Sequence, residues 1–162
     1  MRQWSALEWA SVLAIAAAVA VFLGSRTRGG SEAIATPYTA DPQRTPGVLN
    51  PDVTQERIGQ TICVRGWTRT IRPPTSYTSE LKVRQMREYG STGSPSDYQE
   101  DHLVSLELGG DPTDPRNLWP EPRPRAEQVD GLENDLNARI CSGSLSLAEA
   151  QARIRKEKYS RG

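Results

Sequence analysis

The sequence predicts an α+β fold with short strands in its middle and amphipathic helices in its final third. Two observations predict this fold. A strand-like segment at residues 98–106 is followed, after a Gly-Gly turn, by a second one at residues 117–119. Beyond the prolines at 120–124, apolar residues recur at the three- and four-residue spacing of a helix. A chain of 162 residues is long enough for one such domain but not for two.

The first 24 residues predict a membrane anchor or an export signal. Residues 10–24 are almost continuously apolar and are preceded by Arg2. This run is shorter than the roughly 20 residues of a spanning helix, unless residues 4–9 supply the first turns. Its length also fits a cleaved signal peptide, although the nearest small-x-small site, at residues 33–35, lies far downstream. We favour an uncleaved anchor, so the membrane is the expected partner of this segment.

Residues 25–50 predict a flexible linker, because they are rich in Gly, Ser, Thr and Pro and lack periodicity. The folded domain is expected to span residues 51–162. After residue 30 the chain carries 17 basic and 19 acidic residues, so its net charge does not indicate a polyanion ligand.

The first half of the domain predicts strands followed by a helix. Residues 61–72 alternate and are rich in β-branched side chains, which predicts one or two short strands that Pro73 and Pro74 end. A helix is expected at about residues 79–89, followed by a loop at residues 90–97. The narrow apolar stripe of that helix consists of Leu81, Val83 and Met86.

The final third predicts two helices. The first spans about residues 125–140 and ends at residues 141–143. Ser146 and Glu149 have the spacing of a capping box, which opens the last helix. The apolar face of the first helix consists of Ala126, Val129, Leu132, Leu136 and Ile140.

Cys63 and Cys141 are the only cysteines and predict a disulfide. They are too far apart in sequence for a metal-ligand spacing, and the chain lacks the further Cys or His that a zinc set requires. An even cysteine count behind an export-like segment is typical of a disulfide, and closing so long a loop is worth about 4 kcal/mol. The alternative is two buried thiols. A disulfide favours a location in the cell envelope, membrane-anchored with an extracytoplasmic domain, or secretion.

A local excess of basic residues lies between positions 65 and 88, where Glu80 and Glu88 are the only acidic residues. Such an excess suits a surface that binds nucleic acid, and a solvated face is the commoner alternative. The basic residues are Arg65, Arg69, Arg72, Lys82, Arg84 and Arg87.

His102 is the only histidine in the chain and follows an acidic residue in the segment Gln99-Glu100-Asp101-His102-Leu103. A Gly109-Gly110 turn and the segment Asn117-Leu118-Trp119 come next. Histidine is the side chain whose unperturbed pKa suits general-base chemistry near neutral pH. The ordinary alternative is a surface Asp-His pair or a structural histidine.

The order of these residues resembles the HNH family of metal-dependent nucleases, which has a ββα-metal fold. The resemblance covers residues 98–140, and the wider segment 58–155 is similar to small exported bacterial proteins that carry this motif. It implies an endonuclease that hydrolyses nucleic acid, DNA rather than RNA, with a divalent metal ion. By this resemblance His102 is the general base, Asp101 is a metal ligand, and Asn117 holds the loop and orients the histidine.

One departure from the family concerns its third motif residue, commonly a metal-binding histidine on the helix, which this chain lacks. Glu127 lies at about the corresponding offset after Asn117, and Asp130 shares its helix face. Either carboxylate can complete a site with Asp101, and oxygen ligands favour Mg²⁺ or Mn²⁺ over Zn²⁺. The departure leaves a second hypothesis, a non-catalytic, disulfide-linked module at the cell envelope that binds cell-wall or nucleic-acid polyanions.

Overall fold

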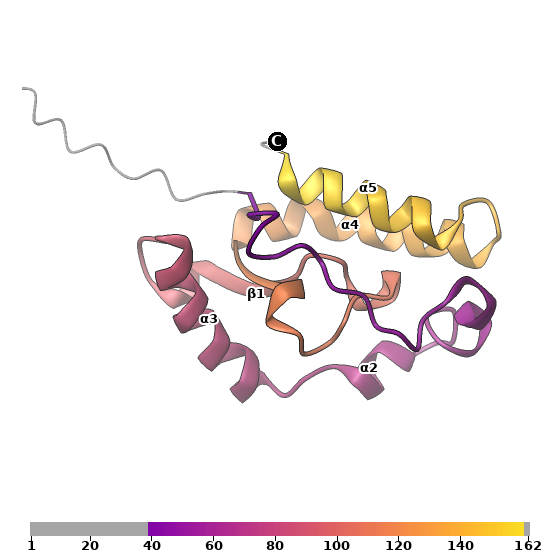
Figure 1. Cartoon of the computed structure of the whole chain (residues 1–162), viewed down its shortest axis with the longest axis horizontal. Coiled ribbons are helices and arrows are strands. Elements are labelled where there is room, and N and C mark those ends of the chain that lie inside the picture. The colour runs from indigo at the N-terminus through magenta and orange to yellow at the C-terminus, as the bar shows by residue number, and fades with distance from the viewer. Residues whose placement is uncertain (1–38, 161–162) are drawn as a thin grey trace, which may run out of the picture. The chain divides into compact units, whose positions relative to one another are not determined.

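A computed structural model describes residues 39–160 of the chain (Figure 1). The expected anchor or signal at residues 1–24 therefore lies outside the described residues. Within residues 39–160 no helix combines the length and apolar character that crossing a membrane requires. Residues 39–50, the described part of the expected linker, belong to the same compact unit as the residues that follow them. There the Ala40 amide donates to the Lys158 carbonyl at 3.1 Å, and Leu49 pairs with Gly110 in an isolated β-bridge.

The architecture is mixed helix and strand, as the α+β prediction required. Strands β1 (Tyr98–His102) and β2 (Leu118–Pro122) form a two-stranded antiparallel sheet, and β2 leads directly into helix α4 (Arg123–Cys141). Short 3₁₀ turns, η2 (Pro95–Asp97) and η4 (Pro115–Asn117), precede the two strands. The register pairs Asp101 with Trp119 and His102 with Leu118.

The prolines at positions 120 and 122 lie inside β2, so the strand extends beyond the predicted residues 117–119. They are two residues apart and therefore present their nitrogens to the same side of the strand. In a two-stranded sheet one side of each strand has no partner, so a missing N–H there costs no ladder hydrogen bond.

The helices flank this sheet. Helix α3 (Thr75–Tyr89) packs near both strands, and α4 lies beside α5 (Leu147–Tyr159) in a helical pair (Figure 1). The expected capping box is present, because the Ser146 and Glu149 side chains bond to each other's backbone amides. Of the expected stripe on α3, Leu81 and Met86 are buried, whereas Val83 is 39% exposed.

Residues 61–72 are not strands, so that prediction was wrong. A 3₁₀ helix, η1 (Gln55–Gln60), leads into tight turns and the short helix α2 (Trp67–Ile71). The backbone there bonds locally, for example from the Cys63 amide to the Ile58 carbonyl at 3.0 Å. An alternating pattern needs a neighbouring strand to become a sheet, and here local bonds satisfy the chain instead.

The main core lies between α4, α5 and the loop that follows β1. It includes Val104 and Leu108 from the loop, Leu136 and Ile140 from α4, and Ile154 from α5. The expected disulfide is present: Cys63 and Cys141 are joined, with Cα atoms 5.5 Å apart. It fastens the irregular segment before α2 to the end of α4.

Gly109 and Gly110 shape the loop between the strands for different reasons. Gly109 has a φ of +80°, which favours glycine. Gly110 has no room for a side chain, because a Cβ atom there would lie 1.7 Å from the Val104 carbonyl oxygen and 2.6 Å from Asn117 Nδ2. The loop is therefore closed too tightly for any side chain at position 110.

Gly110→Ala is expected to lower the free energy of unfolding by at least about 3 kcal/mol, because a backbone oxygen cannot move aside as a flexible side chain can. Urea unfolding of the two proteins measures the change. Gly131→Ala is the matched control, since nothing lies within 4 Å of a Cβ there and the residue is inside α4. That variant is expected to gain about 0.5–1 kcal/mol. Equal stability of the two variants would contradict the proposed close approach.

Candidate functional site

The most tightly packed charges in the described structure surround Lys158 of α5, whose side chain is fully buried. Its Nζ atom donates to Asp101 of β1, lies 2.8 Å from Glu133 Oε1 of α4 and donates to the His102 carbonyl at 2.7 Å. Glu121 of β2 lies 3.6 Å away. We call Asp101, Glu121, Glu133 and Lys158 the buried ion cluster.

The pKa values in this cluster follow from burial and charge. Burial alone would lower the pKa of Lys158 and raise that of Asp101, but their mutual attraction outweighs it, so both groups stay ionised. Burial raises the pKa of Glu121 to about 9, and the nearby Asp101 charge adds to this. The pKa of Glu133 is raised to about 7 for similar reasons. Asp101 is thus committed to Lys158 and is not available as a metal ligand.

His102 lies at the end of β1 and is only 5% exposed, so it is not part of a surface pair. Its Nε2 atom lies 3.1 Å from the Pro112 carbonyl oxygen. Burial lowers the pKa of His102 below its ordinary 6.5, although the Asp101 charge opposes the effect. Because a carbonyl only accepts, Nε2 must carry the proton of the neutral ring, which leaves a lone pair on Nδ1. No described residue forms a hydrogen bond with that Nδ1 atom.

Asn117 ties the two sides of the loop together and is fully buried. Its Oδ1 accepts from the Val104 amide at 3.0 Å, while its Nδ2 donates to the carbonyls of Val104 and Asp111 at 3.1 and 2.9 Å. Asp111 directly precedes Pro112, whose carbonyl meets the His102 ring. Asn117 therefore ties the segment before Pro112 to the loop that follows β1.

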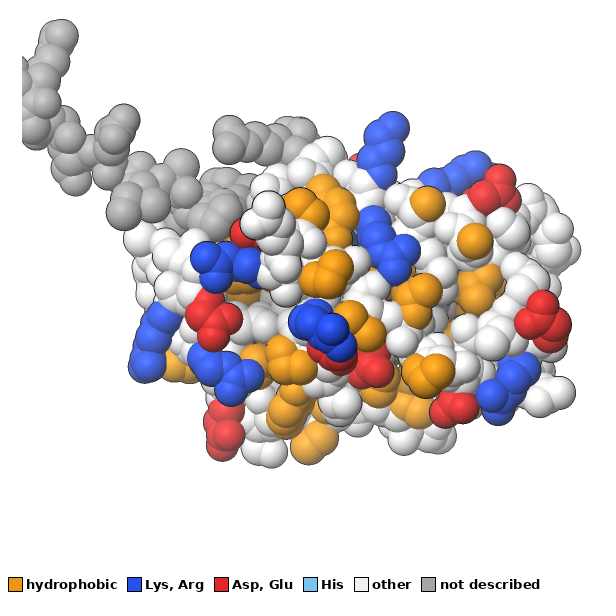
Figure 2. Space-filling view, viewed as in Figure 1, with side chains coloured by type: hydrophobic (Ala, Val, Ile, Leu, Met, Phe, Trp, Pro, Cys, Tyr) orange, Lys and Arg blue, Asp and Glu red, His pale blue; other side chains and the backbone are white. Residues whose placement is uncertain are grey.

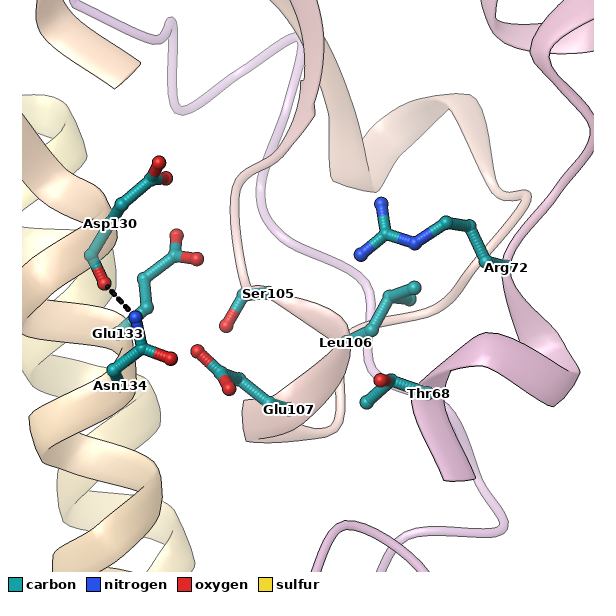
Figure 3. Close-up of a pocket in the computed structure, with 8 residues that line it drawn as sticks. All are labelled: Thr68, Arg72, Ser105, Leu106, Glu107, Asp130, Glu133 and Asn134. Atoms are coloured by element: carbon teal, nitrogen blue, oxygen red, sulfur yellow. Dashed lines mark hydrogen bonds between the residues drawn. The ribbon is translucent and has the colours of Figure 1, made fainter. Parts of the chain in front are cut away.

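A cavity of about 240 Å³ lies between α4, α2 and the loop after β1 (Figure 3). Asp130 and Glu133 of α4 lie on one side, and Glu107 and Arg72 extend from other elements, as Figure 3 shows. Arg72 is also near enough to His102 to lower its pKa further. The lining residues are Thr68, Arg72, Ser105, Leu106, Glu107, Asp130, Glu133 and Asn134.

The structure separates the carboxylates that the sequence grouped as metal ligands. Asp130 lines the cavity, Asp101 belongs to the buried ion cluster, and Glu127 is exposed on α4 outside the cavity lining. As the side chains lie, no group of three His, Cys, Asp or Glu residues within 39–160 converges closely enough to hold a metal ion. The predicted set of Asp101 with Glu127 or Asp130 therefore does not fit a metal ion.

Sequence reasoning missed Glu107, Glu133 and Lys158. Glu133 could have been found from the sequence, because it follows Asp130 by three residues and so lies on the same helix face as Asp130. Lys158 gave no signal, since a basic residue in the last turn of a helix has an ordinary role there.

The six basic residues between positions 65 and 87 do not share one environment. Arg72 lines the cavity of Figure 3, and Arg65 lines an adjoining cavity of about 270 Å³ beside the disulfide. Lys82 donates to the Tyr98 carbonyl at 3.1 Å, and Arg84 pairs with Glu88. On the face in Figure 2, Lys and Arg side chains are scattered among acidic and hydrophobic ones. Arg69 and Arg87 are exposed.

Comparisons of this chain with protein-family models, curated proteins and solved structures found no match.

Lys158→Met is expected to lower the free energy of unfolding by about 3–5 kcal/mol, because it leaves the Asp101 charge buried without its partner. Adding Asp101→Asn to this variant should restore part of the loss, since the uncompensated charge is then gone. Urea unfolding at pH 7 measures both. Lys156→Met, an exposed change on the same helix, is the control and should have little effect. A Lys158→Met protein as stable as the wild type would show that the cluster contributes nothing.

Proposed function

We propose that this domain hydrolyses phosphodiester bonds of nucleic acid with His102 as the general base. The observation that carries the proposal is the state of the His102 ring. It is neutral at pH 7, its Nε2 proton is directed at a backbone carbonyl, and its Nδ1 lone pair has no partner among the described residues. A further support is the order of β1, the loop held by Asn117, β2 and α4, which is the arrangement expected of an HNH-like ββα core.

In this mechanism Nδ1 removes a proton from the attacking water, which makes the ring an imidazolium. The water oxygen forms a bond to phosphorus, the bond from phosphorus to the leaving oxygen breaks, and the leaving oxygen takes a proton from solvent. The neighbouring Asp101 charge favours that form, because it raises the pKa of His102. The Pro112 carbonyl keeps the ring in one orientation throughout. A general base of this kind contributes about 10²–10⁴-fold to the rate.

Arg72 is the residue best placed to bind the phosphate. It is exposed, lines the cavity and lies near enough to His102 to affect its pKa. A guanidinium matches the geometry of two phosphate oxygens. Thr68, on the same wall, can donate a further hydrogen bond from its hydroxyl. DNA is the proposed substrate in preference to RNA, and no catalytic step is assigned to a metal bound by Asp101 and Glu127, since those residues do not meet.

We also propose an extracytoplasmic location, with the domain anchored at the membrane or secreted. The disulfide between Cys63 and Cys141 supports it, because such bonds persist in oxidising compartments.

The second candidate is a non-catalytic binding module at the cell envelope. The disulfide is equally compatible with it, and the low exposure of His102 favours it over chemistry. In that case the Arg65 and Arg72 cavities would bind polyanions without cleaving them.

His102→Ala is expected to reduce cleavage of plasmid DNA by about 10²–10⁴-fold, because no other side chain replaces the Nδ1 base. The full chain is incubated with plasmid DNA or with RNA, with Mg²⁺, Mn²⁺ or a chelator, and products are followed on gels. Glu127→Gln is the control, since this exposed residue lies outside the cavity. Thermal unfolding verifies that His102→Ala remains folded. A wild type that binds DNA but cleaves it under none of these conditions would leave only the binding module.

The acid limb of the kcat/KM profile is expected to have a midpoint below pH 6.5, because a base with a lowered pKa stays neutral further into acid. Arg72→Gln should move that midpoint upward, since the Arg72 charge lowers the pKa of His102. Arg69→Gln, an exposed neighbour on α2, should leave it unchanged. Equal midpoints in the wild type and Arg72→Gln would contradict an effect of the Arg72 charge on the pKa of the catalytic base.

A further inference from the structure

We propose that the cavity of Figure 3 is a subsite for one unpaired guanine base, whose N–H groups donate to Glu107 and Asp130 while its phosphate lies at Arg72. The place of this subsite beside the His102 base rests on the proposed function, whereas its ability to select guanine does not.

The cavity presents hydrogen-bond acceptors from two elements. Glu107 extends from the 3₁₀ turn η3 (Leu106–Leu108), and Asp130 lies on α4 (Figure 3). Within residues 39–160 neither carboxylate has a hydrogen bond or an ion pair with another residue. Asn134 donates through Nδ2 to the Asp130 carbonyl at 2.9 Å, which leaves its Oδ1 as a further acceptor. A ligand between α4 and η3 must therefore supply hydrogen-bond donors.

Ser105 supplies an independent observation. The residue is only 7% exposed, and its buried Oγ atom has no hydrogen-bond partner within the described part of the chain. In Figure 3 that oxygen points into the cavity, toward the space between Glu107 and Asn134. A buried hydroxyl without a partner is costly, so a ligand that bonds to it gains affinity. The O6 atom of a guanine held by Glu107 would accept a hydrogen bond from this hydroxyl.

Among the groups of a nucleic acid, a base edge matches these acceptors and a phosphate does not. Phosphate oxygens only accept hydrogen bonds, so the carboxylates repel them. Guanine presents two adjacent donors, N1–H and N2–H, which one carboxylate receives as a bidentate pair. Adenine and cytosine present an amino group beside a ring nitrogen that accepts, and thymine presents one N–H between two carbonyls. Guanine is therefore the base whose edge best fits Glu107, with Asp130 as acceptor for the second N2 hydrogen.

The cavity takes one base and sets its direction. Its volume of about 240 Å³ has room for a single base but not for a base pair. In a duplex the donor edge of guanine is paired, so the subsite requires a single strand or a base extruded from the stack. Arg72 extends from another element than the two carboxylates, and its guanidinium matches phosphate oxygens (Figure 3). The strand is thus oriented with its phosphate at Arg72 and its base edge toward Glu107.

The test measures binding of short single-stranded DNA to the full chain by fluorescence anisotropy, in a chelator and without cleavage. An oligothymidine strand is compared with strands that carry one central guanine, adenine or cytosine. The wild type is expected to bind the guanine strand about tenfold or more tightly than the other three, the discrimination that one bidentate base contact provides. In fully paired duplexes of the same sequences this preference should disappear, because the guanine edge is occupied.

The ratio of the affinities for the guanine and thymine strands is the quantity that the variants report. Glu107→Gln should lower this ratio to about one, because a glutamine amide sets its own N–H group against a guanine donor. Asp130→Asn and Ser105→Ala should lower it in part. Glu127→Gln is the matched control, because it removes a charge from α4 outside the cavity. It should raise the affinity for both strands alike and leave the ratio unchanged. Circular dichroism and thermal unfolding verify that each variant is folded.

A wild type that binds none of the strands, or all four equally, would overturn the guanine subsite. So would an affinity ratio that Glu107→Gln leaves unchanged. Because binding is measured without cleavage, a guanine preference that depends on Glu107 in a protein that cleaves nothing supports the subsite and removes the nuclease. Cleavage that depends on His102, by a protein without a base preference, overturns the subsite and leaves the nuclease.

Discussion

The ammonium of Lys158 is the interaction on which the rest of the domain depends. It lies on α5 and contacts carboxyl groups from β1, β2 and α4, so one buried cation connects the sheet to both long helices. Desolvating these charges is costly, and an apolar replacement of similar volume can be equally stable. What the ion cluster adds is geometry, because each carboxylate must point at one atom. A shift of the sheet or of either helix would break at least one of these contacts.

The ion cluster gives the adjacent residues Asp101 and His102 different roles. Successive side chains of a strand point to opposite faces, so Asp101 faces α4 and α5 while His102 faces the Pro112 segment. An acidic residue beside a histidine predicted a metal ligand next to a general base from the sequence alone. In the structure Asp101 holds the sheet in place, and only its charge reaches the histidine. The surroundings of His102 are therefore built by the loop, through Asn117 and Pro112.

Local and covalent signals made much of the fold predictable. Three features were predictable because each depends on residues close in sequence or on one covalent bond. They are the capping box at Ser146, the apolar spacing of α4 and the cysteine pair. Residues 61–72 were wrongly predicted as strands, because an alternating sequence pattern does not indicate whether a partner strand exists. Lys158 lies 57 residues from Asp101, and no local pattern links two charges at that distance. His102 and Asn117 could be located by motif, but the lining of the cavity required the structure.

Glu133 belongs to both the buried ion cluster and the cavity. A substitution of Glu133 therefore has a different meaning from a substitution of Glu107 or Asp130. One of its oxygens contacts Lys158 and its side chain also lines the cavity, so a change at Glu133 alters packing and cavity charge together. Glu107 and Asp130 contribute to the cavity wall without contacting Lys158. Changes at these two residues therefore alter the cavity without removing a contact of Lys158. The same sharing means that Lys158, by favouring the ionised form of Glu133 against the effect of burial, helps to keep that wall negative. The interaction that fixes the fold thereby also sets the charge of the cavity.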